Sequence, residues 1–105
     1  MIDLDAQPLL TDFGSVENSP TLSDEFRAKF RSELIDTSRL RHHIVTGGEG
    51  PPLLMLAGWP QSWFAWRYLM PDLAKSYRLI VADPRGVGLS DKTEHGYDSL
   101  SQSED

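Results

Sequence analysis

Hydrophobic residues follow two kinds of spacing along this chain, and the first kind is helical. Phe26, Phe30 and Leu34 recur every four positions, with basic residues between them. This spacing predicts an amphipathic helix over residues 21–34. We expect its apolar stripe to pack on a sheet, because such stripes form the buried side of a helix.

Two short segments that partly alternate between apolar and polar residues follow, and alternation is typical of strands. Residues 33–36 and 40–46 predict a hairpin with its bend at residues 37–39. His42 and His43 are neighbours within the second strand, so their side chains point to opposite faces of the sheet. They cannot chelate one metal ion, and we expect one exposed and one packed histidine.

The second kind of spacing is an unbroken apolar run, which is typical of strands covered on both faces of a parallel sheet. Residues 53–56 form one such run, and a second run ends a strand predicted over residues 78–82. Between them a helix is predicted from Trp63, with a kink or restart at Pro71 because proline lacks a backbone N–H. Strand, helix and strand in this order form a βαβ unit with a right-handed crossover.

The βαβ unit places two loops at one edge of the sheet, where open α/β sheets bind ligands. The first loop is Gly58-Trp59-Pro60. Gly58 permits a sharp turn and Pro60 biases Trp59 toward an extended conformation. The Trp59 N–H can therefore point away from the sheet, as one half of an oxyanion hole does. The alternative is an ordinary strand-to-helix turn.

The second loop contains two closely spaced glycines, Gly86 and Gly88, which invite comparison with a dinucleotide-binding fingerprint. The third glycine of that fingerprint is Asp91 in this chain, and no helical pattern begins there. Pro84 and Arg85 also separate the strand from the first glycine. We therefore reject the dinucleotide interpretation.

Composition narrows the functional classes. The 105 residues have room for one small domain, and the net charge of −6 argues against a nucleic-acid partner. The chain has no cysteine, which excludes a disulfide scaffold and is compatible with a reducing compartment. Acidic residues near the N-terminus do not fit a signal peptide, and no apolar run approaches the roughly 20 residues that span a bilayer. We expect a cytoplasmic protein that binds no membrane.

A set of motifs spans roughly residues 30–98. These motifs are Gly48-Glu49-Gly50-Pro51-Pro52 with the apolar run that follows, Ala57-Gly58-Trp59-Pro60, Trp63, Trp66-Arg67, Met70-Pro71, Tyr77-Arg78, Asp83-Pro84-Arg85-Gly86-Val87-Gly88-Leu89-Ser90-Asp91-Lys92 and Gly96-Tyr97-Asp98. Together they resemble the N-terminal part of an α/β-hydrolase. The resemblance is strongest to the epoxide-hydrolase-like branch, which includes haloalkane and haloacetate dehalogenases.

The resemblance implies an α/β fold class, a truncated α/β-hydrolase fold with an N-terminal helix, a β-hairpin and one parallel βαβ unit. It also implies hydrolysis of an epoxide, ester or carbon–halogen bond by water, with no cofactor and no metal. Trp59 would supply an oxyanion-hole N–H, and the proline after it is often cis in the family. The residues implied to shape the two site loops are Ala57, Gly58, Pro60, Asp83, Arg85 and Gly86.

Two positions depart from the family pattern. Ala57 stands where the family has a histidine that holds the loop by hydrogen bonds. Ser38-Arg39 stands at the hairpin bend, where the family commonly has Asn-Gly. Because arginine meets a steric penalty at positive φ, a different turn type is expected. Residues 99–105 are polar and without periodicity, so we expect a disordered tail that replaces family sequence.

The chain is thus expected to divide into an N-terminal arm and helix over residues 1–29, a partial hydrolase domain over residues 30–98 and a tail over residues 99–105. The first 20 residues are expected to have little core of their own.

The family nucleophile, acid and catalytic histidine are absent from the sequence. One hypothesis is a hydrolase fragment, inactive alone, that meets a small-molecule substrate only with its C-terminal part. The other is a non-catalytic pseudo-enzyme fragment or a protein-binding piece. An uncovered sheet also predicts self-association.

Overall fold

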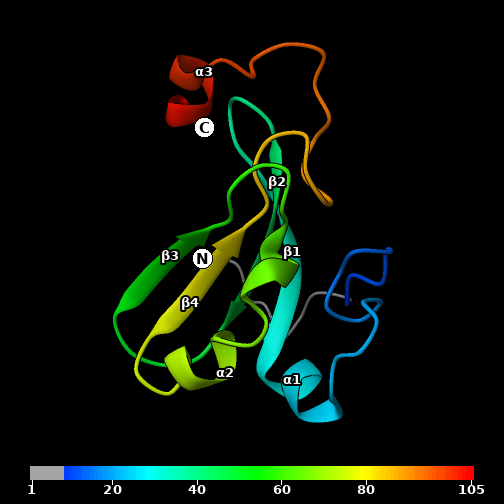
Figure 1. Ribbon diagram of the computed structural model, residues 1–105, viewed down its shortest axis with the longest axis vertical. Helices are drawn as coiled ribbons and strands as arrows, with labels where there is room; N and C mark the ends of the chain where they lie inside the picture. Colours follow the sequence, from blue (N-terminus) through cyan, green and yellow to red (C-terminus); the bar gives the residue numbers. More distant parts are fainter. Residues whose placement is uncertain (1–8) are drawn as a thin grey trace.

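The structure is a computed structural model that describes residues 9–105, and its centre is a four-stranded mixed sheet in the order β1-β2-β4-β3 (Figure 1). Strands β1 (Phe30–Asp36) and β2 (Arg41–Gly47) form an antiparallel hairpin. Strand β4 (Arg78–Ala82) lies antiparallel to β2, and β3 (Pro52–Leu56) lies parallel to β4. The predicted hairpin and the predicted parallel pair are both confirmed.

The connection between β3 and β4 contains two short helices. The first, η2 (Trp63–Trp66), is a 3-10 helix whose N-cap Ser62 accepts a hydrogen bond from the Phe64 N–H at 3.3 Å. The second, α2 (Met70–Leu73), carries a proline in its first turn. The predicted restart at Pro71 is confirmed, because proline needs no N–H partner in the first turn of a helix.

The N-terminal helix is shorter than predicted. Helix α1 covers only Asp24–Lys29, and the chain passes directly from it into β1 at Phe30. Ser23 caps the helix by accepting a hydrogen bond from the Phe26 N–H at 3.1 Å. The four-residue spacing of the apolar stripe was therefore misleading: an even spacing also matches the period of a strand, where residues two and four apart share one face.

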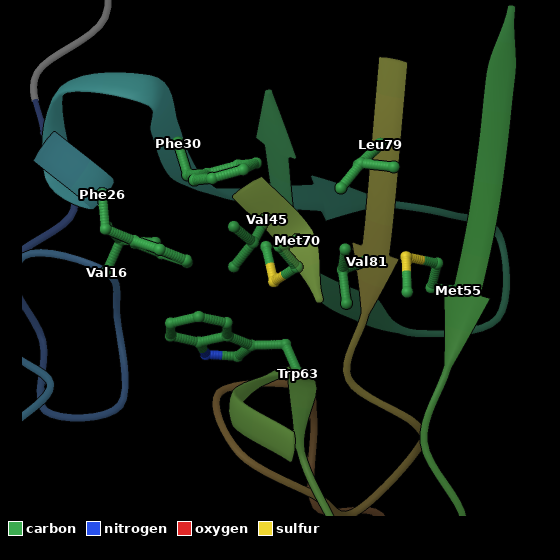
Figure 2. Packing of buried hydrophobic residues seen from close by; sticks show 9 residues of the cluster. All are labelled: Val16, Phe26, Phe30, Val45, Met55, Trp63, Met70, Leu79 and Val81. Carbon is green, nitrogen blue, oxygen red and sulfur yellow. The ribbon is translucent and has the colours of Figure 1, made fainter. Parts of the chain in front are cut away.

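The hydrophobic core lies on one face of the sheet, against the N-terminal arm, α1, η2 and α2 (Figure 2). Figure 2 shows its nine buried residues, which are Val16, Phe26, Phe30, Val45, Met55, Trp63, Met70, Leu79 and Val81. Val16 is fully buried, and the carbonyl oxygen of Gly14 accepts a hydrogen bond from Trp63 Nε1–H at 2.9 Å. The expectation that the first 20 residues have little core is therefore wrong for this part of the arm.

The other face of the sheet is covered incompletely. Leu54 and Leu56 of β3 are 62% and 55% exposed, whereas Met55 between them is 7% exposed. The apolar run was predicted to be covered on both faces, and that prediction is wrong here. Strand β3 is at the edge of the sheet, and one of its faces carries leucines in contact with solvent. We call this side of the sheet the open face.

The C-terminal residues are helical rather than disordered. Helix α3 covers Ser99–Glu104, and its N-cap Asp98 accepts a hydrogen bond from the Ser101 N–H at 3.0 Å. It lies near the tip of the β1–β2 hairpin (Figure 1), where Arg39 Nε donates to Asp105 Oδ1 at 2.9 Å. The prediction from periodicity failed because a cap and ion pairs, not an apolar stripe, hold this helix.

Residues 1–8, the first part of the predicted arm, lie outside the described residues. Over residues 9–105, the structure has no helix with the length and apolar character needed to cross a bilayer. The hairpin bend is confirmed: the Thr37 N–H donates to the Leu40 carbonyl at 3.1 Å. Neither Ser38 nor Arg39 has a positive φ, so the turn differs from an Asn-Gly turn as expected.

Candidate active site

The two predicted site loops leave the sheet side by side. Leu56 pairs with Ala82 at the ends of the parallel strands β3 and β4, so the segments that follow begin at the same edge. Trp59 and Arg85, one from each loop, line a cavity of about 560 Å³ on the open face. The prediction that both loops lie at one edge of the sheet is therefore confirmed.

The first loop presents the backbone of Trp59. Trp59 is 74% exposed, and the Trp59–Pro60 peptide bond is cis. A turn closes where the Gln61 N–H donates to the Gly58 carbonyl at 2.8 Å. The N–H of Trp59 has no hydrogen-bond partner among residues 9–105. A donor without a partner at the carboxyl edge of a parallel pair is available to an anionic oxygen.

The first loop begins with Ala57 and Gly58. Ala57 is half-buried and lines the same cavity as Trp59. Gly58 does not have a positive φ, and a Cβ built on it would meet no atom within 4 Å. The observed turn at Gly58 therefore does not use the left-handed backbone that favours glycine.

The second loop is organised by the buried carboxylate of Asp83. Its Oδ1 accepts a hydrogen bond from the Trp63 N–H at 2.8 Å, and its Oδ2 accepts one from the Leu89 N–H at 3.2 Å. Gly88 has a φ of 57°, and a Cβ on it would lie 2.1 Å from Asp83 Oδ2. Gly86 has a φ of 78°, and a Cβ there would lie 2.7 Å from the Tyr97 ring. Both positions therefore require glycine.

Arg85 connects the second loop to the C-terminal helix. It is 7% exposed, and its Nε donates to Asp105 Oδ2 at 2.8 Å while its Nη2 donates to Oδ1 of the same carboxylate at 2.5 Å. Its Nη1 also donates to the His95 carbonyl at 3.2 Å. The hydrogen bonds from Arg85 lower the pKa of Asp105 to about 2, and the same bonds raise the pKa of Arg85. This bidentate pair commits the guanidinium to Asp105.

A buried cluster that sequence reasoning missed lies behind the two loops. His43 Nδ1 is 2.6 Å from Asp83 Oδ2, and His43 Nε2 is 2.8 Å from Ser32 Oγ. The order serine, histidine, aspartate matches that of a hydrolytic triad. The prediction of one packed histidine is confirmed by His43, which has no exposed surface. The prediction that the other is exposed is wrong, because His42 is half-buried on the open face.

The cluster is nevertheless unable to attack a substrate. Ser32 is 5% exposed, and Asp83 has no exposed surface. The Ser32 hydroxyl oxygen already accepts a hydrogen bond from the Val16 N–H at 2.8 Å, so the arm encloses it. A nucleophile must be reached by the reacting carbon atom. Only a strand assignment for residues 30–36 could have revealed the cluster, because a helix places Ser32 elsewhere.

The described residues show no arrangement suited to a metal ion. Over residues 9–105, no group of three or more His, Asp or Glu side chains converges as metal ligands. The ring of His42 instead lies with Nδ1 3.2 Å from the Asp83 carbonyl oxygen. Since a carbonyl only accepts, His42 carries a proton on Nδ1 in this contact.

Comparison with known proteins agrees with this architecture. Residues 51–105 match the family described as the alpha/beta hydrolase fold. The chain is 46% identical over 65 residues to the soluble epoxide hydrolase of Corynebacterium sp. (strain C12), covering 62% of this chain and 23% of that protein. It is 41% identical over 63 residues to the fluoroacetate dehalogenase of Burkholderia sp, covering 60% of this chain and 21% of that protein.

A solved structure shows the same arrangement of elements. Cfl2 from Burkholderia cenocepacia superposes with a TM-score of 0.69 at 36% sequence identity, covering 82% of this chain and 28% of that chain. The sheet, the two edge loops and these matches together define an α/β hydrolase of the epoxide-hydrolase-like type. The chain belongs to the alpha/beta hydrolase fold family.

The matches also bear on the extent of the chain. It spans less than a quarter of the length of the two curated relatives. The family match continues through residue 105, so the interpretation that residues 99–105 replace family sequence is wrong. The helix expected of the family at this place begins with α3, but its residues carry no apolar stripe from which the sequence could have predicted it.

Proposed function

We propose that this chain is the N-terminal part of an epoxide-hydrolase-like enzyme and supplies the oxyanion-binding edge of its active site. In this proposal Trp59 donates its backbone N–H to an oxygen that gains negative charge as an epoxide, ester or carbon–halogen bond is hydrolysed by water. Ala57, Gly58 and Pro60 shape its loop. Asp83, Arg85 and Gly86 shape the loop beside it.

One observation carries the proposal: at the edge of the parallel pair, the Trp59 N–H has no hydrogen-bond partner within the described residues 9–105. Oxyanion donors act through preorganisation, so the loop must be held before substrate arrives. Here the turn is closed by the Gln61-to-Gly58 bond, and Trp63 is fixed by Asp83. These anchors are compatible with loss of the family histidine at Ala57.

A second function is supported by a different observation. Leu54 and Leu56 expose an apolar surface on the edge strand β3, and such edges promote association between chains. We propose that the isolated chain self-associates through this open face.

We also propose a location in the reducing cytoplasm, which the absence of cysteine from the sequence supports.

The catalytic proposal predicts that the chain acts only together with the remainder of a hydrolase. The test replaces the matched segment of the Corynebacterium soluble epoxide hydrolase with this chain's residues and measures turnover of a model epoxide. We expect turnover by the chimera and none by the isolated chain, because no nucleophile elbow of the form Gly-x-Asp/Ser-x-Gly is present in its 105 residues.

The matched control is the unmodified relative measured beside the chimera. A folded chimera without turnover would contradict the catalytic proposal. Turnover by the isolated chain above that of a boiled sample would contradict it equally, because a single N–H donor supplies no covalent chemistry.

A further inference from the structure

We propose that His43 is a positioning residue for the Trp59 loop, and that it acts through a proton held on Nδ1 against the Asp83 carboxylate. The inference rests on the proposed role of the Trp59 N–H. It begins with the cluster of Ser32, His43 and Asp83, which is enclosed and therefore has no access to substrate. Its hydrogen bonds lead instead toward the site.

The hydrogen-bond partners of the His43 ring indicate which nitrogen carries a proton. Ser32 Oγ accepts the Val16 N–H at 2.8 Å, and among residues 9–105 its other partner is His43 Nε2, also at 2.8 Å. A hydroxyl can donate one hydrogen bond and accept two, so this contact accommodates Nε2 with or without a proton. Nδ1 faces the Asp83 carboxylate at 2.6 Å. A carboxylate accepts hydrogen bonds, so the ring proton lies on Nδ1.

The Asp83 carboxylate transmits this constraint to both site loops. Oδ2 is shared by His43 and the Leu89 N–H, while Oδ1 accepts from the Trp63 N–H at 2.8 Å. Trp63 begins η2, four residues after Trp59. Since β3 ends at Leu56, the Trp59 loop is anchored at one end by the sheet and at the other by Asp83. Without His43 the carboxylate loses its shortest hydrogen bond.

The backbone of His43 makes the same connection. Its N–H donates to Ser90 Oγ at 2.9 Å, and that hydroxyl donates to the Asp83 carbonyl at 2.7 Å. The Asp83 N–H in turn donates to the His43 carbonyl at 2.9 Å. The backbone bonds hold Asp83 beside β2, and the ring selects the orientation of its carboxylate.

Two substitutions separate positioning from packing. His43→Asn keeps an N–H close to the place of Nδ1–H but removes volume, whereas His43→Leu keeps apolar volume but removes the donor. Hydrogen exchange at the Trp63 and Trp59 amides is measured in the 105-residue chain, with Lys75→Ala as control because Lys75 is exposed and pairs with Asp72. We expect exchange at Trp63 to accelerate about tenfold or more in His43→Leu, as expected for loss of a hydrogen bond to a charged group, and less in His43→Asn.

The ring itself supplies a signature that packing alone would not. Histidine nitrogen shifts of the wild-type chain should show a proton held on Nδ1 of His43. A ring that averages both tautomers, whether in an ordered or a loosely folded chain, overturns the proposal. So does faster exchange in His43→Asn than in His43→Leu, the order that lost packing predicts. Neither readout depends on turnover, so a chimera without activity would refute the proposed function and leave this inference standing.

Discussion

At the scale of single residues, Gly88 and Asp83 make the tightest approach in the candidate site. A Cβ on Gly88 would lie 2.1 Å from Asp83 Oδ2, and the φ of 57° is unfavourable for other residues. We predict that Gly88→Ala lowers the free energy of unfolding by about 2 kcal/mol or more, from a left-handed backbone and a displaced buried carboxylate.

Gly58→Ala is the matched control for this prediction. Its Cβ would meet no atom within 4 Å, and its φ is not positive. Alanine there should leave the free energy of unfolding unchanged or raise it by up to about 1 kcal/mol. Urea titration of both variants provides the comparison. Equal stabilities for the two alanine variants would show that Asp83 does not need the space that Gly88 leaves.

The contrast between these two glycines also shows what sequence reasoning could reach. Both stand in the two loops that the sequence placed at one edge of the sheet, and Trp59 and Arg85 of these loops line one cavity. The physical need for each glycine depends on atoms distant in sequence. Asp83 lies five positions before Gly88, but its carboxylate is held there by Trp63 and His43. No local pattern contains that information.

At the scale of elements, helix α3 depends on two arginines. Asp105 accepts hydrogen bonds from Arg85 and Arg39, and Arg39 also lies 3.2 Å from Glu104. The Arg85 bonds lower the pKa of Asp105 from 3.8 to about 2. A depressed folded-state pKa means that the ion pair stabilises docking of α3 above pH 3.8 and loses that effect as the pH falls through about 2.

We predict that acidification from pH 4 to pH 2 releases α3 from the hairpin and that Arg85→Ala releases it already at neutral pH. Carbon chemical shifts of Leu100 and Gln102 measure the helix directly. Lys75→Ala is the control, because its ion pair with Asp72 is exposed and contributes little. An α3 that keeps its helical shifts in Arg85→Ala would refute the claim.

Secondary structure was predictable where the spacing of apolar residues fitted only a helix or only a strand, and not where it fitted both. The hairpin, β3 and β4 were found because their residues alternate or run unbroken. The four-residue spacing of Phe26, Phe30 and Leu34 fits both a helix and a strand. Phe26 lies in α1, whereas Phe30 and Leu34 lie in β1, which pairs with β2. Helix α3 was missed because Asp98 and Asp105, rather than apolar residues, stabilise it.

At the scale of the whole molecule, we expect the open face of the sheet to determine whether the chain self-associates in solution. Leu54 is 62% exposed on the edge strand, so a charge there should remove association without lowering the free energy of unfolding. We predict that Leu54→Lys sediments as a monomer at concentrations where the wild-type chain forms larger species. Sedimentation velocity provides the measurement.

Leu100→Lys is the matched control, since Leu100 is 70% exposed but lies on α3. It should leave association unchanged. If both lysine variants dissociate to the same extent, any exposed leucine promotes association, and the open face has no special role in it. If neither does, the self-association proposal fails.

The account as a whole depends on a single backbone donor, the Trp59 N–H. The most direct measurement is kcat in the hydrolase chimera for Trp59→Pro, which removes that N–H, against Trp59→Phe, which keeps it. We expect kcat to fall about 10²–10³-fold in Trp59→Pro and to change little in Trp59→Phe. An ester in place of the Gly58–Trp59 amide removes the same N–H without adding a ring, and should reproduce the loss if Trp59→Pro folds poorly. Equal kcat values with and without the N–H would contradict the account.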